Sequence, residues 1–171
     1  DLGHDYLLDF EERTTEINRN SVPTGWDCIN EVMDGGLGPG ELGVAVAPSG
    51  VGKTWVLCAL GAAAVKAGLN VVHYSLELSE HYVGQRYDTV FTQIPSSDVK
   101  EKKEMVLDKI QRLKGKLLIK YYPPKGISPK AIESHIEKMT AAGNKPDLII
   151  IDYADLLLSH TCLLYTSPSP R

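Results

Sequence analysis

Residues 47–54 read APSGVGKT, and this stretch decides the fold. Gly52, Lys53 and Thr54 match the end of the phosphate-binding pattern G-x-x-x-x-G-K-[ST], while Ala47 stands at the position of its first glycine. Backbone N–H groups of such a loop wrap around phosphate oxygens, so Gly50 and Gly52 are expected to supply bends and a close approach that a Cβ would obstruct. The stretch therefore predicts a site for a nucleoside triphosphate.

The residue types of this loop predict separate roles. Lys53 is expected to reach the β- and γ-phosphates, and the Thr54 hydroxyl can bind Mg²⁺. The helix that follows presents its positive end to the triphosphate. ATP and Mg²⁺ are therefore the expected cofactors. The predicted nucleotide-binding residues are Pro48, Ser49, Gly50, Val51, Gly52, Lys53, Thr54 and Trp55.

The flanking segments favour a functional loop over a chance glycine-rich turn. Residues 41–47 (ELGVAVA) form a short apolar run bounded by Gly40 and Pro48, as expected of a buried strand. Residues 54–66 are rich in alanine and predict a helix, after which Gly68 occupies a C-cap position. Strand, loop and helix in this order are the setting that the motif requires.

The rest of the chain continues this alternation. Further strands are predicted at residues 70–76, 117–122 and 147–152, and further helices at 80–92, 98–114 and from 129 onward. Ser79 and Ser128 are placed to cap two of these helices, and Pro129 suits a first helical position. The order β-α-β-α-β-α-β predicts an α/β fold with a mainly parallel sheet and helices on both faces.

Two acidic residues follow predicted strands. Asp152 ends the apolar run LIIID, the Walker B pattern, and is expected to hold Mg²⁺ beside the loop because ligands bind beyond the carboxyl ends of parallel strands. Glu77 follows the strand at 70–76 and can act as the base for an attacking water. The structural alternatives are a strand-end cap for Asp152 and an exposed residue favourable to a helix dipole for Glu77.

Composition narrows the class of protein. The chain has 171 residues, 43% of them hydrophobic and 23% charged, which suits one globular domain. A net charge of −4 shows no basic nucleic-acid-binding surface in the totals. No apolar run reaches the roughly 18 residues of a membrane span, and no secretory signal begins the chain. Three cysteines without metal spacing fit a reducing cytoplasm.

Several segments closely resemble DnaB-type replicative helicases. SLELS at residues 75–79 resembles the family's SLEMS, whose acid is the catalytic glutamate, which corresponds to Glu77. PTGWDCINEVMDGGLGPGELG at 23–43 is similar to the family's T-G-x-x-x-L-D and G-G-L-x-P-G-E-L motifs, and LIIIDYADLL at 148–157 to its I-D-Y-L-Q-L. Asn30 and Asp155 depart from this pattern, since the family has Asp and Gln there.

The resemblance implies a RecA-like P-loop NTPase core that is incomplete at its C-terminal side. In this family the DNA-binding loops, the arginine finger and a core strand between the loop strand and the Walker B strand all follow Walker B. A whole family member is a hexameric ring that moves along single-stranded DNA in a bacterial or phage-infected cytoplasm and contacts primase. RecA/RadA-like recombinases and KaiC-like regulatory ATPases share parts of this pattern and stay as alternatives.

Three segments follow from this comparison. Residues 1–20 are expected to be a linker remnant, and residues 21–160 a partial RecA-like ATPase domain that is itself a poor ATPase. Residues 162–171 (CLLYTSPSPR) resemble translated sequencing-adapter DNA, so 161–171 are expected to be an artefactual or disordered tail. A natural flexible tail is the alternative.

Overall fold

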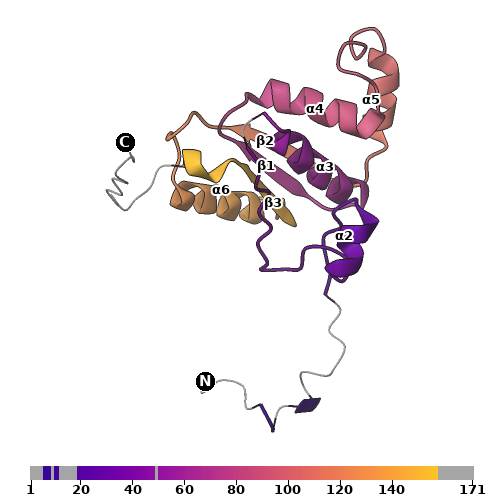
Figure 1. Cartoon of the computed structure of the whole chain (residues 1–171). Coiled ribbons are helices and arrows are strands. Elements are labelled where there is room, and N and C mark those ends of the chain that lie inside the picture. Colours follow the sequence, from indigo (N-terminus) through magenta and orange to yellow (C-terminus); the bar gives the residue numbers. More distant parts are fainter. Residues whose placement is uncertain (1–5, 9, 12–18, 49, 158–171) are drawn as a thin grey trace, which may run out of the picture.

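The structure, a computed structural model, describes residues 6–8, 10–11, 19–48 and 50–157 (Figure 1). No helix within these ranges is long and apolar enough to cross a bilayer. Most of the expected linker (residues 1–20) and all of the expected tail (residues 161–171) lie outside the described residues. The helices and strands are α2 (Asp27–Val32), α3 (Lys53–Lys66), β1 (Val71–Ser75), α4 (Glu80–Thr92), α5 (Lys103–Gln111), β2 (Leu117–Tyr121), α6 (Pro129–Ala141), β3 (Leu148–Asp152) and the 3₁₀ turn Ala154–Leu156.

The sheet is parallel and has the order β2-β1-β3, so β1 is its central strand (Figure 1). The register pairs Ser75 at the end of β1 with Tyr121 on one side and Asp152 on the other. Two backbone hydrogen bonds extend this pairing, from Leu76 N to the Asp152 oxygen at 2.8 Å and from Tyr122 N to the Ser75 oxygen at 2.9 Å. The carboxyl ends of all three strands therefore meet at one edge of the sheet.

Both faces of the sheet carry helices, as the alternating sequence pattern predicted. Every residue of β1 is buried, and alternate side chains point to opposite faces. Val72 and Tyr74 pack toward α6, where Ile132 is buried. On the other face, Cys58 of α3 packs with Tyr87 of α4. This is the three-layer α/β arrangement, with α3 and α6 on opposite sides of the sheet (Figure 1).

The helix ends are largely those that the capping residues predicted. After α3, Gly68 has φ +96° and donates to the Val65 oxygen, while Leu69 donates to the Ala64 oxygen, which is a Schellman ending. Ser128 caps α6 by accepting a hydrogen bond from Ala131 N at 3.3 Å. Ser79 takes the N-cap position of α4, but its side chain makes no capping hydrogen bond.

The strand predicted at residues 41–47 is absent, which corrects the sequence-based expectation. Leu42, Val44 and Val46 are 87%, 72% and 89% exposed, and no backbone hydrogen bond within the described residues joins 42–47 to a strand. A strand needs a neighbouring ladder to satisfy its backbone groups. The family resemblance places another core strand between this segment and β3, and the described residues contain none. The sheet therefore has three described strands instead of four.

Two smaller differences concern α5 and the segment before α3. The helix expected at 98–114 begins only at Lys103, because residues 98–102 form turns and offer little apolar surface to pack. Asn30, a departure from the helicase pattern, has a structural role. Its Oδ1 accepts hydrogen bonds from Thr24 N at 2.9 Å and from the Thr24 hydroxyl at 2.7 Å. These bonds tie α2 to the chain that leads into it.

Candidate nucleotide site

The loop before α3 has two glycines in the left-handed backbone region. Gly50 and Gly52 have φ values of +80° and +102°, a region that residues with a Cβ rarely adopt. An added Cβ at either glycine would meet nothing within 4 Å. The positive φ values favour glycine at both positions, and the described protein atoms leave the space beside them open. The open space beside them is where an anion has room to bind.

Lys53 is the first residue of α3 and folds back over this loop. Its Nζ donates hydrogen bonds to the Ala47 oxygen at 2.8 Å and to the Pro48 oxygen at 3.0 Å. These two carbonyl oxygens hold the ammonium group beside the loop. Phosphate oxygens of a bound nucleotide would be alternative acceptors for it there. The two bonds to the carbonyls use two of the three N–H donors of the ammonium group, so one donor is left for a phosphate oxygen, and charge favours that acceptor over a carbonyl.

The first turn of α3 presents the remaining predicted loop residues. Trp55 N and Val56 N both donate to the Gly52 oxygen, at 2.9 and 3.1 Å, so the hydrogen bonding of the helix begins immediately after the loop. Thr54 is buried and Trp55 is 42% exposed. The Arg86 guanidinium of α4 lies 5.3 Å from the centre of the Trp55 ring. Ser49 lies outside the described residues.

Asp152 is buried at the end of β3 and points toward α3. It is 1% exposed, and its Oδ2 has no hydrogen-bond partner within the described part of the chain. Burial raises the pKa of the Cys58 thiol of α3 to about 12, and the nearby Asp152 carboxylate contributes to this increase. Thr54 lies one helical turn before Cys58, so Asp152 and Thr54 are on the same side of the sheet. A buried carboxylate oxygen without a partner is suited to bind a cation or its water.

Glu77 lies at the same edge of the sheet, in the turn that leads from β1 to α4. The Ser75 hydroxyl braces this turn by donating to the Leu78 oxygen at 2.6 Å and accepting from Leu78 N at 3.1 Å. Glu77 itself is exposed. The structure thus brings Glu77 and Asp152 to neighbouring strand ends, while none of the contacts that it describes joins Glu77 directly to the loop.

A buried polar pair beneath the site was missed by the sequence-based predictions. His73 Nδ1 and the Tyr87 hydroxyl lie 2.9 Å apart, and both side chains are almost fully buried. Burial lowers the pKa of His73 to about 4, against the opposing effect of Asp152. The available signal was the strand VVHYS, in which two polar residues, His73 and Ser75, share one face of an otherwise apolar strand.

A second residue that sequence reasoning missed is Arg86. It lies on α4, beside the first turn of α3, and its charge acts against the burial-driven increase in the pKa of Cys58. A single Arg in the middle of an amphipathic helix gives no sequence signal for a role at this edge. Only the packing of α4 against α3 places it near the loop.

Fold and site together define the class of protein. A parallel sheet with helices on both faces, a glycine loop before α3 and an unpartnered carboxylate at a strand end are the features of a RecA-like ATPase domain. The family model for the DnaB-like helicase C-terminal domain matches residues 21–163. The chain therefore belongs to the DnaB-like helicase C-terminal domain family.

Individual relatives agree with this assignment. The chain is 28% identical over 179 aligned residues to a DnaB-like replicative helicase of Enterobacteria phage T4, covering 98% of this chain and 38% of that protein. Among solved structures, a DnaB-like replicative helicase described with its interactions with primase is similar with a TM-score of 0.73 and 18% identity, over 95% of this chain and 42% of the other.

A second solved structure supports the same fold. The ATPase domain of G40P is similar with a TM-score of 0.68 and 18% identity, over 90% of this chain and 56% of that one. At such identities the two structures establish the RecA-like fold alone. The chain spans little more than a third of the phage T4 relative and about half of the solved chains.

Proposed function

We propose that residues 21–160 form a partial RecA-like domain that is the ATP-binding and ATP-hydrolysing motor core of a DnaB-like replicative DNA helicase. The observation that carries this proposal is the pairing of two features at one sheet edge. The loop with left-handed Gly50 and Gly52 opens α3, and the unpartnered, buried Asp152 Oδ2 faces the same helix. The first feature suits a triphosphate and the second suits its counter-ion.

In this proposal each residue of the chain has a distinct task. Backbone N–H groups of the loop, from Ser49 to Thr54, bind the phosphates, and Lys53 moves its ammonium from the loop carbonyls to phosphate oxygens. Glu77 orients the attacking water and accepts its proton, because it is exposed at the strand edge and free to turn toward the loop.

The residues present fit a magnesium ion. Mg²⁺ prefers oxygen ligands. Thr54 offers a hydroxyl at the start of α3, and Asp152 offers a carboxylate oxygen without another partner. When bound, the ion would neutralise charge on the phosphates. The low exposure of Asp152 keeps competing water away from this carboxylate.

The first test concerns Lys53. In Lys53→Ala the 171-residue chain should lose the increase in melting temperature that ATP and Mg²⁺ give to the unmodified chain, since the phosphates lose their charged partner. Lys103→Ala at the start of α5 removes the same charge far from the loop and should keep the increase. Equal stabilisation of both variants by ATP would contradict the nucleotide site.

The second test concerns Glu77. Glu77→Gln should bind ATP as the unmodified chain does but hydrolyse it more slowly by orders of magnitude, measured as single-turnover phosphate release in a complete family member that carries this domain. Glu104→Gln on α5 is the matched control. A variant that binds ATP more weakly yet turns over each bound ATP at the normal rate would make Glu77 a structural residue.

Assembly and partners belong to the same proposal. The family match and the phage T4 relative favour the helicase over a recombinase or a KaiC-like regulator. On this basis the whole protein forms a homo-oligomeric, hexameric ring that moves along single-stranded DNA in the bacterial or phage-infected cytoplasm. The solved relative with primase supports a primase contact. The isolated chain should hydrolyse ATP poorly, because the family's arginine finger lies beyond Walker B.

A further inference from the structure

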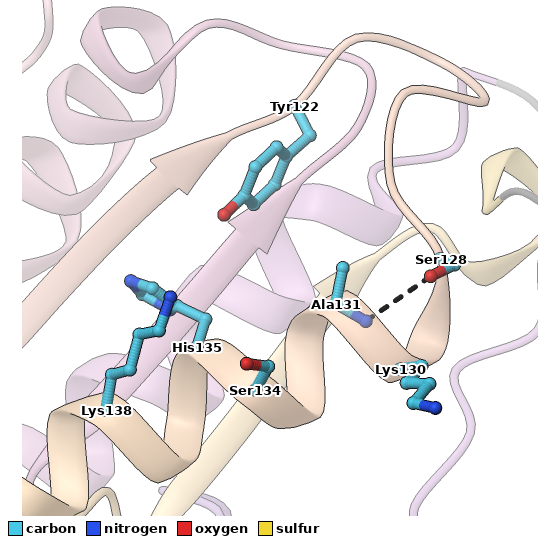
Figure 2. A pocket seen from close by; sticks show the side chains of 7 residues that line it. All are labelled: Tyr122, Ser128, Lys130, Ala131, Ser134, His135 and Lys138. Carbon is cyan, nitrogen blue, oxygen red and sulfur yellow. Dashed lines mark hydrogen bonds between the residues drawn. The ribbon is translucent and has the colours of Figure 1, made fainter.

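A cationic cavity lies on the far side of the sheet from the nucleotide loop. Its volume is about 500 Å³, and Figure 2 shows it between Tyr122, which follows β2, and α6. α6 packs on the sheet face opposite to α3, so this cavity is separate from the loop at residues 47–54. The residues that line it are Tyr122, Ser128, Lys130, Ala131, Ser134, His135 and Lys138.

The charge of this cavity is opposite to that of the chain. Its lining includes Lys130, Lys138 and the imidazole of His135 but no carboxylate, whereas the whole chain has a net charge of −4. In Figure 2, Tyr122, His135 and Lys138 lie toward one end of the lining, and Ser128 and Lys130 lie toward the other. Neither lysine forms an ion pair within the described residues.

The ring of His135 is held in place from behind. Its Nδ1 lies 2.7 Å from the hydroxyl of Tyr74, a fully buried residue of the central strand. This bond uses Nδ1, which leaves Nε2 as the polar atom available to the cavity. The ring edge also contacts Tyr74 with centroids 5.7 Å apart. The His135 ring is therefore held in position, and its Nε2 is a donor in the tautomer whose Nδ1 accepts from the Tyr74 hydroxyl.

From this geometry we infer that the cavity binds a phosphate group of a nucleotide or of a nucleic-acid strand. The Lys138 ammonium and the hydroxyls of Ser134 and Tyr122 supply donors, and His135 Nε2 adds another when the Tyr74 hydroxyl donates to Nδ1, so the set suits an anion that has several oxygens. The Tyr122 ring itself stacks on Tyr74 and has the Lys120 Nζ 5.7 Å from its centre, so Tyr122 contributes its hydroxyl to the cavity. This inference is independent of the proposed ATPase function.

The experiment separates this cavity from the nucleotide loop by using the Lys53→Ala background. Inorganic phosphate, AMP and an eight-residue oligothymidylate are each titrated into the 171-residue chain, while the ¹⁵N resonances of the imidazoles are followed by NMR. His135 should shift and exposed His81 on α4 should not. Lys138→Gln should weaken binding roughly tenfold, the effect of one charge-assisted hydrogen bond. Lys103→Gln is the matched control.

The outcomes distinguish the source of the phosphate. A His135 shift with tighter binding of the oligonucleotide than of AMP indicates a nucleic-acid strand, and a shift with AMP or phosphate but not with the oligonucleotide indicates a free ligand. Either result supports the inference. It is overturned if none of the three probes shifts His135, or if Lys138→Gln and Lys103→Gln bind them equally. Circular dichroism of each variant verifies its fold.

Discussion

Gly61, in the middle of α3, should be intolerant of the smallest possible substitution. A Cβ added there would lie 3.0 Å from the Ile150 Cδ1 and 3.1 Å from the Tyr87 Cζ, and would overlap the Tyr87 hydroxyl oxygen. The Ile150 side chain can turn away, but Tyr87 cannot, because its hydroxyl is bonded to the buried His73 Nδ1 at 2.9 Å. Alanine at position 61 therefore forces a displacement of the Tyr87 ring.

The size of the effect follows from three opposing contributions. Overpacking a close-packed core costs about 1–3 kcal/mol, and leaving a buried hydrogen-bonding group without its partner costs about 1–3 kcal/mol more. Alanine gains about 1 kcal/mol over glycine in helix propensity. The sum predicts that Gly61→Ala lowers the free energy of unfolding by about 3 kcal/mol. The destabilisation caused by crowding is thus larger than the stabilisation that alanine gains from its higher helix propensity.

Urea unfolding of the 171-residue chain measures this difference, with Gly84→Ala as the matched control. Gly84 is also helical, in α4, but an added Cβ there meets only Ile119 Cδ1 at 3.9 Å, which is ordinary contact. Gly84→Ala should therefore be neutral or stabilising by up to about 1 kcal/mol. Equal stability of the two alanine variants would refute the reasoning.

A double-mutant cycle with Tyr87→Phe identifies the atom responsible. Phenylalanine removes the hydroxyl that the new Cβ would overlap, so Gly61→Ala should cost about 1 kcal/mol or less in that background. The expected coupling energy between the two positions is about 2 kcal/mol. Additive effects would mean that Tyr87 is not the obstacle.

Three further predictions follow from burial and capping. Ser128→Ala should destabilise the chain by about 1 kcal/mol in urea unfolding, and Ser79→Ala by less, because only Ser128 makes a capping hydrogen bond. Burial raises the pKa of Cys58 to about 12, so only about one thiol in ten thousand is ionised at pH 8, and mass spectrometry should find exposed Cys28 alkylated much sooner. Burial lowers the pKa of His73 from 6.5 to about 4. As pH falls, the His73 imidazole is therefore protonated in the unfolded state at a higher pH than in the folded state. Unfolding free energy should therefore drop by about 3 kcal/mol between pH 6.5 and 4, and His73→Gln should flatten this dependence.

Local patterns predicted those parts of the fold that local physics determines. The loop, the helix starts at Ser79 and Ser128 and the apolar runs of β1 and β3 all follow from short stretches of sequence. The missing strand at 41–47 shows the limit, since apolar content expresses a tendency to form a strand while the ladder depends on a distant neighbour. The buried pair of His73 and Tyr87 was likewise invisible, because it needs the packing of α4 onto β1.

The packing of α3 links this core to the proposed chemistry. Because residues 42–47 form no ladder within the described residues, the contacts of α3 with the sheet are what position Thr54 relative to Asp152. Thr54 lies seven residues before Gly61, or about 10 Å along the helix axis. A tilt of only about 6° at Gly61 would therefore move Thr54 by about 1 Å, a displacement that can cost about a hundredfold in rate. The close approach of Gly61 to Ile150 and Tyr87 thus fixes the geometry of the loop as well as the stability of the domain.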